Sequence, residues 1–308
     1  MDIVTDKNEL ERYIRKIIEI FDINELSGEH IEIGEIIEYY EKSELGYKFF
    51  HSPEGAIHMA LNFDGEFNKD GYLEQVRIID NLIKKSKPKD ILELGSGKGF
   101  NSIYLAKENP QSLFTGIDLT PSHVSSAKEA GKNISNAQFQ VGDFHKLNFK
   151  SMSFDLVFEI ESVCHALDMG LALSEIHRVM REDGVFILFD GFRKPGFVNL
   201  DKNLQLASKL TEISMAVKKP FIVDDFILLA ETKGFELVEL KDLSTAIIPN
   251  LRKFQIMARG YFKYPFIAKL LLRVLSPYLI KNAVAGLLMP FIIMGDAEGY
   301  FQITLKRK

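Results

Sequence analysis

The stretch Asp90-Ile91-Leu92-Glu93-Leu94-Gly95-Ser96-Gly97-Lys98-Gly99 decides the fold of this chain of 308 residues. A short apolar run, typical of a buried strand, leads into three glycines at every second position. Glycine permits a tight turn and lets the backbone approach a ligand closely at the N-terminus of a following helix. The stretch therefore predicts a strand, a ligand-binding turn and a helix from about Phe100 to Lys107.

Apolar runs and helical segments alternate beyond this turn. Strands separated by helices of this length indicate a parallel sheet that is covered on both faces. A further strand is expected at 235–243, and the alternation from Gly299 to Lys306 predicts a closing strand. The runs that predict strands after the turn are LFTGID (113–118), AQFQVGD (137–143), FDLVFEI (154–160) and VFILFDG (185–191).

The glycine turn alone leaves two kinds of cofactor open. Dinucleotide-binding enzymes use a related turn, but their glycines follow the spacing G-x-G-x-x-G. The acidic Glu93 would repel a pyrophosphate and suits a ligand that carries an ammonium group. Asp118 ends the second strand, where a carboxylate can accept hydrogen bonds from both hydroxyls of a ribose. Asp143 ends the third strand, and Phe144 beside it could cover an adenine ring.

This combination resembles the Rossmann-like class I S-adenosylmethionine-dependent methyltransferases, over about Asp90 to Phe192. The resemblance implies an α/β fold with a mostly parallel seven-stranded sheet and an antiparallel last strand, and S-adenosylmethionine as the cofactor. It assigns cofactor binding to Glu93, Gly95, Ser96, Gly97, Gly99, Asp118, Leu119, Gly142, Asp143, Phe144 and Glu159.

The segment from Glu159 to Asp168 follows the fourth strand, at the sheet edge where α/β active sites gather. With its Glu, Cys-His-Ala and Asp, it resembles the sterol C-methyltransferases and their prenyl-lipid relatives. Glu161 and His165 are the candidates for the catalytic base, because methyl transfer requires positioning and the removal of one proton. Glu161 as a capping or salt-bridging carboxylate is the alternative.

Residues ahead of the glycine turn add to the predicted site. His58 resembles a histidine of tocopherol-type methyltransferases, and a hydrogen-bonded structural role is an equal alternative to catalysis. An aromatic region loosely matches the substrate region of the sterol enzymes, although the chain has no Trp. The predicted substrate contacts are Tyr39, Tyr40, Tyr47 and Phe50.

The chain divides into four predicted segments. Residues 1–85 supply N-terminal helices and a substrate-lid segment, and residues 86–192 form the cofactor-binding core. Residues 193–298 form a mainly helical insertion on the substrate side, which includes the strand at 235–243, and residues 299–308 close the core sheet. The two outer helical segments are expected to form a cap over the core.

The apolar stretch Phe266–Met294 has three interpretations: a core of its own, the wall of a lipophilic pocket, or a face that touches a membrane. Its longest uncharged run, Asn282–Gly295, is shorter than the roughly 20 residues that span a bilayer. The chain begins Met-Asp without the pattern of a signal peptide, so we expect a cytoplasmic protein that is either free or attached peripherally to a membrane.

Composition excludes several other classes. A formal net charge of -5 does not favour nucleic-acid binding. Cys164 is the single cysteine, which excludes an intrachain disulfide and a Cys-rich zinc site, and no metal site is expected.

The function expected is C- or O-methylation of a lipophilic prenyl- or sterol-like molecule. Two alternatives stay open: methylation of a small polar natural-product hydroxyl or amine, and a module that binds its cofactor without turnover. The sequence leaves undecided the acceptor, the atom methylated and the oligomeric state.

Overall fold

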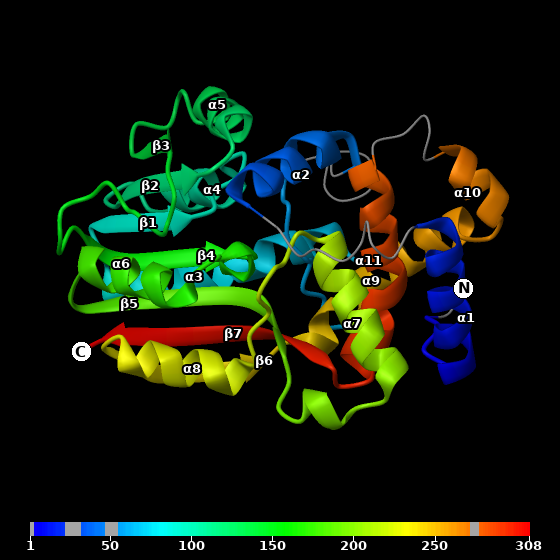
Figure 1. Ribbon diagram of the computed structural model, residues 1–308. Helices are drawn as coiled ribbons and strands as arrows, with labels where there is room; N and C mark the ends of the chain where they lie inside the picture. Colours follow the sequence, from blue (N-terminus) through cyan, green and yellow to red (C-terminus); the bar gives the residue numbers. More distant parts are fainter. Residues whose placement is uncertain (1–2, 22–31, 47–54, 272–276) are drawn as a thin grey trace.

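A computed structural model describes residues 3–21, 32–46, 55–271 and 277–308. Its centre is a seven-stranded sheet in the order β3-β2-β1-β4-β5-β7-β6 (Figure 1). The strands are β1 (Asp90–Leu94), β2 (Leu113–Asp118), β3 (Ala137–Val141), β4 (Phe154–Ile160), β5 (Met180–Arg193), β6 (Phe235–Asp242) and β7 (Glu298–Arg307).

Strand directions confirm the predicted sheet. Strands β3, β2, β1, β4 and β5 pair in parallel, whereas β7 runs antiparallel to both of its neighbours, β5 and β6. The strand expected at 235–243 is β6, and it lies at the edge of this same sheet. The closing strand β7 is therefore inserted between β5 and β6.

Alternation along the strands produces a core on each face of the sheet. On β4, Leu156 and Phe158 belong to one buried cluster and Val157 to the other, because successive side chains of a strand point to opposite faces. The first cluster packs against α3 (Glu74–Ser86) and α4 (Phe100–Glu108), and the second against α6 (Met169–Val179) and α8 (Val223–Thr232). Helix α5 (Pro121–Ala130) packs beside β2 and β3.

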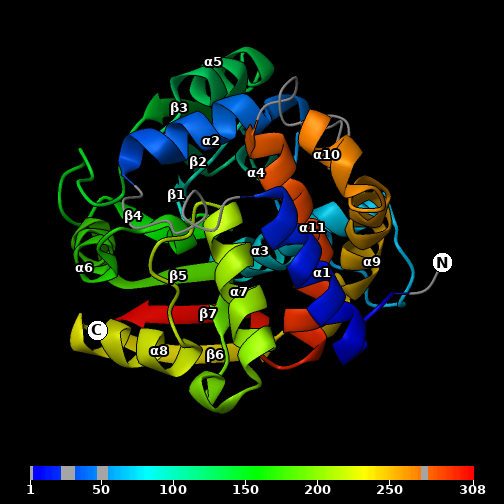
Figure 2. The ribbon, with the colours of Figure 1, turned by 45° about the vertical axis from the view of Figure 1, so that its right-hand side comes forward.

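The remaining helices gather beyond the sheet (Figures 1 and 2). Helix α11 packs against α7, α9, α2 and α1, and many of its buried residues share one hydrophobic cluster with one face of the sheet. No helix among the described residues has the length and hydropathy needed to cross a membrane. These helices are α1 (Lys7–Ile20), α2 (Ile33–Gly46), α7 (Lys202–Ser214), α9 (Ser244–Tyr261), α10 (Pro265–Leu271) and α11 (Pro277–Met294).

Candidate active site

The glycine turn joins β1 to α4 in a conformation that requires glycine. Gly95, Gly97 and Gly99 all have positive φ, at 65°, 51° and 83°, a region that residues with a Cβ enter at a cost. At Gly95 a Cβ would also lie 2.3 Å from the Cβ of Ser162. The turn therefore brings its backbone against the loop that follows β4.

Glu93 lies behind this turn and differs from the sequence interpretation. Its carboxylate is buried and accepts hydrogen bonds from Asn101 Nδ2 at 2.9 Å and from the Ser102 amide at 3.2 Å. Burial raises its pKa to about 7. Both oxygens thus bind the first turns of α4, so the side chain holds the helix in place and its position gives no support to an ammonium contact.

A small cavity opens where the turn meets the ends of β2 and β3. We call it the loop cavity; its volume is about 80 Å³. Asp118 lines it and accepts hydrogen bonds from the amides of Gly97 and Thr120, both at 2.8 Å. Burial acts to raise the pKa of Asp118, but His123 and these amides outweigh it and lower the pKa. The other predicted cofactor residues in its wall are Gly95, Ser96, Gly97, Leu119, Gly142 and Phe144.

Four predicted cofactor residues do not line the loop cavity: Glu93, described above, and Gly99, Asp143 and Glu159. Asp143 Oδ1 accepts hydrogen bonds from the His145 amide at 2.8 Å and from His145 Nδ1 at 2.7 Å. Glu159 is fully buried, and its Oε2 accepts hydrogen bonds from the amides of Ser162 at 2.7 Å and Val163 at 3.2 Å. Glu159 therefore holds the backbone at the start of the loop after β4 in place.

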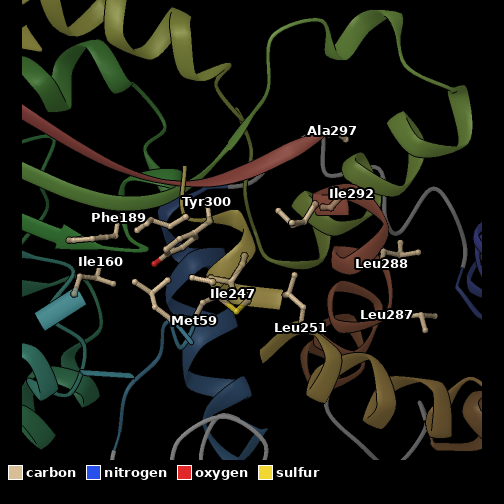
Figure 3. Packing of buried hydrophobic residues seen from close by; sticks show 14 of the residues in the cluster. Met59, Ile160, Phe189, Ile247, Leu251, Leu287, Leu288, Ile292, Ala297 and Tyr300 are labelled. Carbon is tan, nitrogen blue, oxygen red and sulfur yellow. The ribbon is translucent and has the colours of Figure 1, made fainter. Parts of the chain in front are cut away.

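A second, larger cavity lies between the sheet and helices α7, α9 and α11. We call it the apolar cavity; its volume is about 350 Å³. Figure 3 shows part of its wall, where Met59, Ile247 and Tyr300 approach one another from three different elements. Helix α11 contributes residues both to the wall of this cavity and to the hydrophobic core. The apolar side chains in its wall include Ile247, Phe254, Met257, Met289, Ile292 and Ile293.

The two cavities meet. Four residues line both of them: Tyr40, Ile57, Glu161 and His165. Two of the four are the predicted base candidates, and Tyr40 is a predicted substrate contact. A ligand in the loop cavity and a ligand in the apolar cavity would therefore contact the same four side chains.

Glu161 occupies this junction with a strained backbone and an altered acidity. Its φ is 56°, which is uncommon for a residue with a side chain and marks many functional sites. Its Oε1 accepts a hydrogen bond of 2.6 Å from the Met59 amide. Burial raises its pKa to about 8, and the nearby Asp190 adds to the shift. The side chain can thus hold or release a proton near neutral pH.

His165 is held between two elements. Its Nδ1 lies 3.2 Å from the Ala216 carbonyl oxygen, and its Nε2 lies 2.8 Å from the Tyr40 hydroxyl. Since Nδ1 faces an acceptor, we assign the ring proton to Nδ1, so that Nε2 accepts from Tyr40. Burial lowers the pKa of His165. The imidazole is therefore neutral and connects α2 to the loop after β4.

His58 lies away from the junction. It lines the loop cavity and does not line the apolar cavity. Its Nδ1 is 3.2 Å from the Met59 carbonyl oxygen, and burial lowers its pKa to about 4. This placement favours the hydrogen-bonded structural role over catalysis.

The substrate contacts predicted from the aromatic region divide in two. Tyr39 and Tyr40 line the apolar cavity, whereas Tyr47 and Phe50 lie outside the described residues. Two further wall residues were missed. Asp190 lies near the end of a parallel strand, and this strand-end position is the feature by which Asp118 was predicted. Tyr300 reaches the site only because the pairing of β7 with β5 places it opposite Gly191.

Comparison with known proteins supports the predicted methyltransferase domain. Residues 85–219, which run from the end of α3 to just beyond α7, match the model of a methyltransferase domain. The solved structure of a cyclopropane synthase from Mycobacterium tuberculosis superimposes with a TM-score of 0.71, at 14% identity over 89% of this chain and 98% of that one. This chain carries a class I methyltransferase domain.

Curated relatives of this chain agree with the predicted resemblance to sterol and tocopherol-type methyltransferases. An S-adenosyl-L-methionine-dependent Diels-Alderase of Talaromyces variabilis is 31% identical over 54% of this chain and 60% of its own length. A 24-methylenesterol C-methyltransferase of Arabidopsis thaliana is 27% identical, over 61% and 53%. A 2-methyl-6-phytyl-1,4-hydroquinone methyltransferase of Synechocystis is 33% identical, over 53% and 45%. The chain thus spans about half the length of these relatives.

Proposed function

We propose that this protein binds S-adenosylmethionine in the loop cavity and methylates a lipophilic small molecule held in the apolar cavity. The observation that carries the proposal is the shared wall of Tyr40, Ile57, Glu161 and His165. The named activities of the sterol and phytyl-hydroquinone relatives support a lipophilic acceptor.

The residues of the loop cavity fit this cofactor. The glycine turn leaves room for a ligand against its backbone, and Asp118 offers a carboxylate to a ribose. The Ser96 hydroxyl is buried in the cavity wall without a hydrogen-bond partner among the described residues. A buried hydroxyl in this state gains free energy when a ligand supplies the missing partner. When bound, S-adenosylmethionine supplies an electrophilic methyl group on a sulfonium.

The chain itself holds the acceptor and removes its proton. Glu161 stands at the junction. In its deprotonated form, its carboxylate accepts a proton from a hydroxyl or from a ring carbon of the acceptor. For an alkene acceptor, its carboxylate stabilises the positive charge that develops. His165 and Tyr40 keep the acceptor against this carboxylate, and His165 is the second candidate base.

Segments on both sides of the cofactor-binding core contribute to the acceptor side. We assign the walls of the apolar cavity to the N-terminal segment 1–85 and the insertion 193–298, with residues 86–192 as the cofactor-binding core and 299–308 closing the sheet. Tyr39 and Tyr40 contact the acceptor from α2.

Helix α10 is the part of the insertion that we propose to contact a membrane. Phe266 is 81% exposed, Tyr264 55% and Leu270 53%, with Lys263 and Lys269 exposed among them. Aromatic and basic side chains in this arrangement favour an anionic lipid surface. Vesicles of phosphatidylglycerol should co-float with the protein, and Phe266→Ser should weaken this while Val198→Ser, at another exposed apolar residue, does not. Equal flotation of both variants would remove α10 from the proposal.

The function is tested with S-adenosylmethionine labelled in its methyl group. The protein is incubated with lipid and quinol extracts, and labelled products are separated and identified. We expect the label in an apolar product and none when Glu161→Gln replaces the wild type. Label in a polar product would redirect the acceptor class to polar natural products. Cofactor binding without any label transfer would instead support a module that uses its cofactor without methyl transfer.

A further inference from the structure

A polar cluster interrupts the apolar cavity away from Glu161. Arg193 at the end of β5 donates to Glu212 of α7, from Nε at 2.7 Å and from an Nη at 2.6 Å. Glu298 at the start of β7 accepts a 2.5 Å hydrogen bond from Ser208. Arg193, Glu212 and Glu298 all line the apolar cavity, so charged groups face a space whose walls are otherwise mostly apolar.

Strand pairing fixes where this cluster stands. Arg193 pairs with Glu298, and two residues earlier on β5 Gly191 pairs with Tyr300. Two residues along a strand span about 7 Å and return to the same face of the sheet. The cluster therefore lies one side-chain repeat from Tyr300, which in turn stands beside Glu161.

The cluster contains more carboxyl groups than cationic groups. It holds two carboxyl groups and one guanidinium, and both Arg193 hydrogen bonds go to Glu212. Burial raises the pKa of Glu298 to about 8, and the charge of Glu212 adds to the shift. Glu298 is therefore largely protonated at neutral pH, and a positive charge bound beside it would favour its ionised form.

An independent observation at the same place points to a ligand. Thr211 lines the apolar cavity beside Glu212 and is only 2% exposed. Its hydroxyl has no hydrogen-bond partner among the described residues. Buried hydroxyls are nearly always hydrogen-bonded in folded proteins. A polar ligand group that enters this end of the cavity would supply the missing partner of Thr211.

We propose that Thr211 and Glu298 form a subsite for a hydrogen-bond-donating group of the acceptor, a hydroxyl or an ammonium. This inference rests on the proposed function, since it treats the apolar cavity as the acceptor site. It deepens that function because the acceptor must be amphipathic, with an apolar body and a donor group about 7 Å along the sheet from Tyr300. A plain hydrocarbon leaves the buried Thr211 hydroxyl without a partner among the described residues.

Three probes of equal chain length test the subsite: 1-decanol, decylamine and decyl methyl ether, which lacks a donor. Binding of S-adenosylhomocysteine is first measured by calorimetry. The affinity of each probe is then measured, in saturating S-adenosylhomocysteine, by its displacement of an environment-sensitive dye from the protein. We expect the alcohol or the amine to bind about tenfold more tightly than the ether. Equal affinity for all three probes would overturn the subsite.

Matched variants assign the effect to these residues. Thr211→Val should remove most of the advantage of the donor probes, and Thr211→Ser should restore it. Ser214→Ala is the control: Ser214 lies on the same helix, and its buried hydroxyl has no partner in the described part of the chain and does not line the cavity. Glu298→Gln should weaken the amine more than the alcohol, since glutamine cannot ionise beside an ammonium group. An equal loss in Ser214→Ala and Thr211→Val would overturn the assignment.

The two proposals fail in different ways. Loss of S-adenosylhomocysteine binding would contradict the proposed function, whatever the probes do. Normal binding of S-adenosylhomocysteine together with equal probe affinities would contradict the subsite alone.

Discussion

Glu161 stands where the two cavities meet, and its raised pKa links the chemistry of the site to stability. The folded protein holds the Glu161 proton up to a pKa of about 8, against 4.5 for an ordinary glutamate. Raising the pH between these values therefore lowers the stability of the folded state. The same deprotonation supplies the base, so turnover should rise with pH and reach half its maximum near pH 8.

Glu161→Gln should separate these two effects. At pH 8 or above the variant should melt a few degrees higher than the wild type, because no charge is buried, and should turn over about 10²- to 10⁴-fold more slowly. Scanning calorimetry and methyl-transfer assays across pH measure both, with the exposed Glu231→Gln as the control. A wild-type rate in Glu161→Gln would transfer proton removal to His165.

Asp118 carries the ribose contact in this account. Asp118→Ala should lower the affinity for S-adenosylhomocysteine by about 10- to 100-fold, because the paired hydrogen bonds to the ribose are lost. Calorimetric titration measures this, and Asp225→Asn, on the exposed surface of α8, should bind like the wild type. Unchanged affinity in Asp118→Ala would refute the role of Asp118.

At the scale of elements, the turn between β1 and α4 admits glycine alone at its first position. Gly95→Ala would combine a positive φ with a Cβ 2.3 Å from Ser162, at a cost of about 1–3 kcal/mol from the backbone alone. We expect a lower melting temperature and weak cofactor binding. Gly34→Ala, where a Cβ meets nothing within 4 Å, should leave both unchanged. A stable, cofactor-binding Gly95→Ala protein would contradict the turn geometry.

Helices α9 and α11 determine the room for the acceptor. Ala258 of α9 lines the apolar cavity, so Ala258→Leu should slow methylation of a lipophilic acceptor by about tenfold or more without altering S-adenosylhomocysteine affinity. Ala207→Leu adds the same volume on α7 at a buried residue outside the cavity wall, and overpacking there costs stability alone. Equal rates in both variants would place the acceptor elsewhere.

At the scale of the whole molecule, short-range sequence patterns predict most of the cofactor side of the site. The glycine spacing and the strand-end position of Asp118 depend on neighbours in sequence, so the strands and much of the loop cavity could be predicted. The exceptions include Glu93, Asp143 and Glu159, whose carboxylates accept hydrogen bonds from nearby backbone and side chains. A strand-end position alone does not reveal which way such a side chain points.

The acceptor half depends on contacts between distant segments. Tyr300 and Glu298 reach the apolar cavity through the antiparallel pairing of β7 with β5, more than a hundred residues away in sequence. The apolar stretch 266–294 could not be assigned among core, pocket and membrane because helical periodicity does not say what a helix packs against. Packing of α11 against α7 and α9 shows that part of it serves as both core and pocket wall.

The most direct test of the central claim is calorimetric titration of the wild-type protein with S-adenosylmethionine, S-adenosylhomocysteine and NAD. We expect S-adenosylmethionine and S-adenosylhomocysteine to bind at the same site, the loop cavity. Neither should bind measurably to the double variant Asp118→Ala, Gly95→Ala. Binding of NAD alone would contradict this claim.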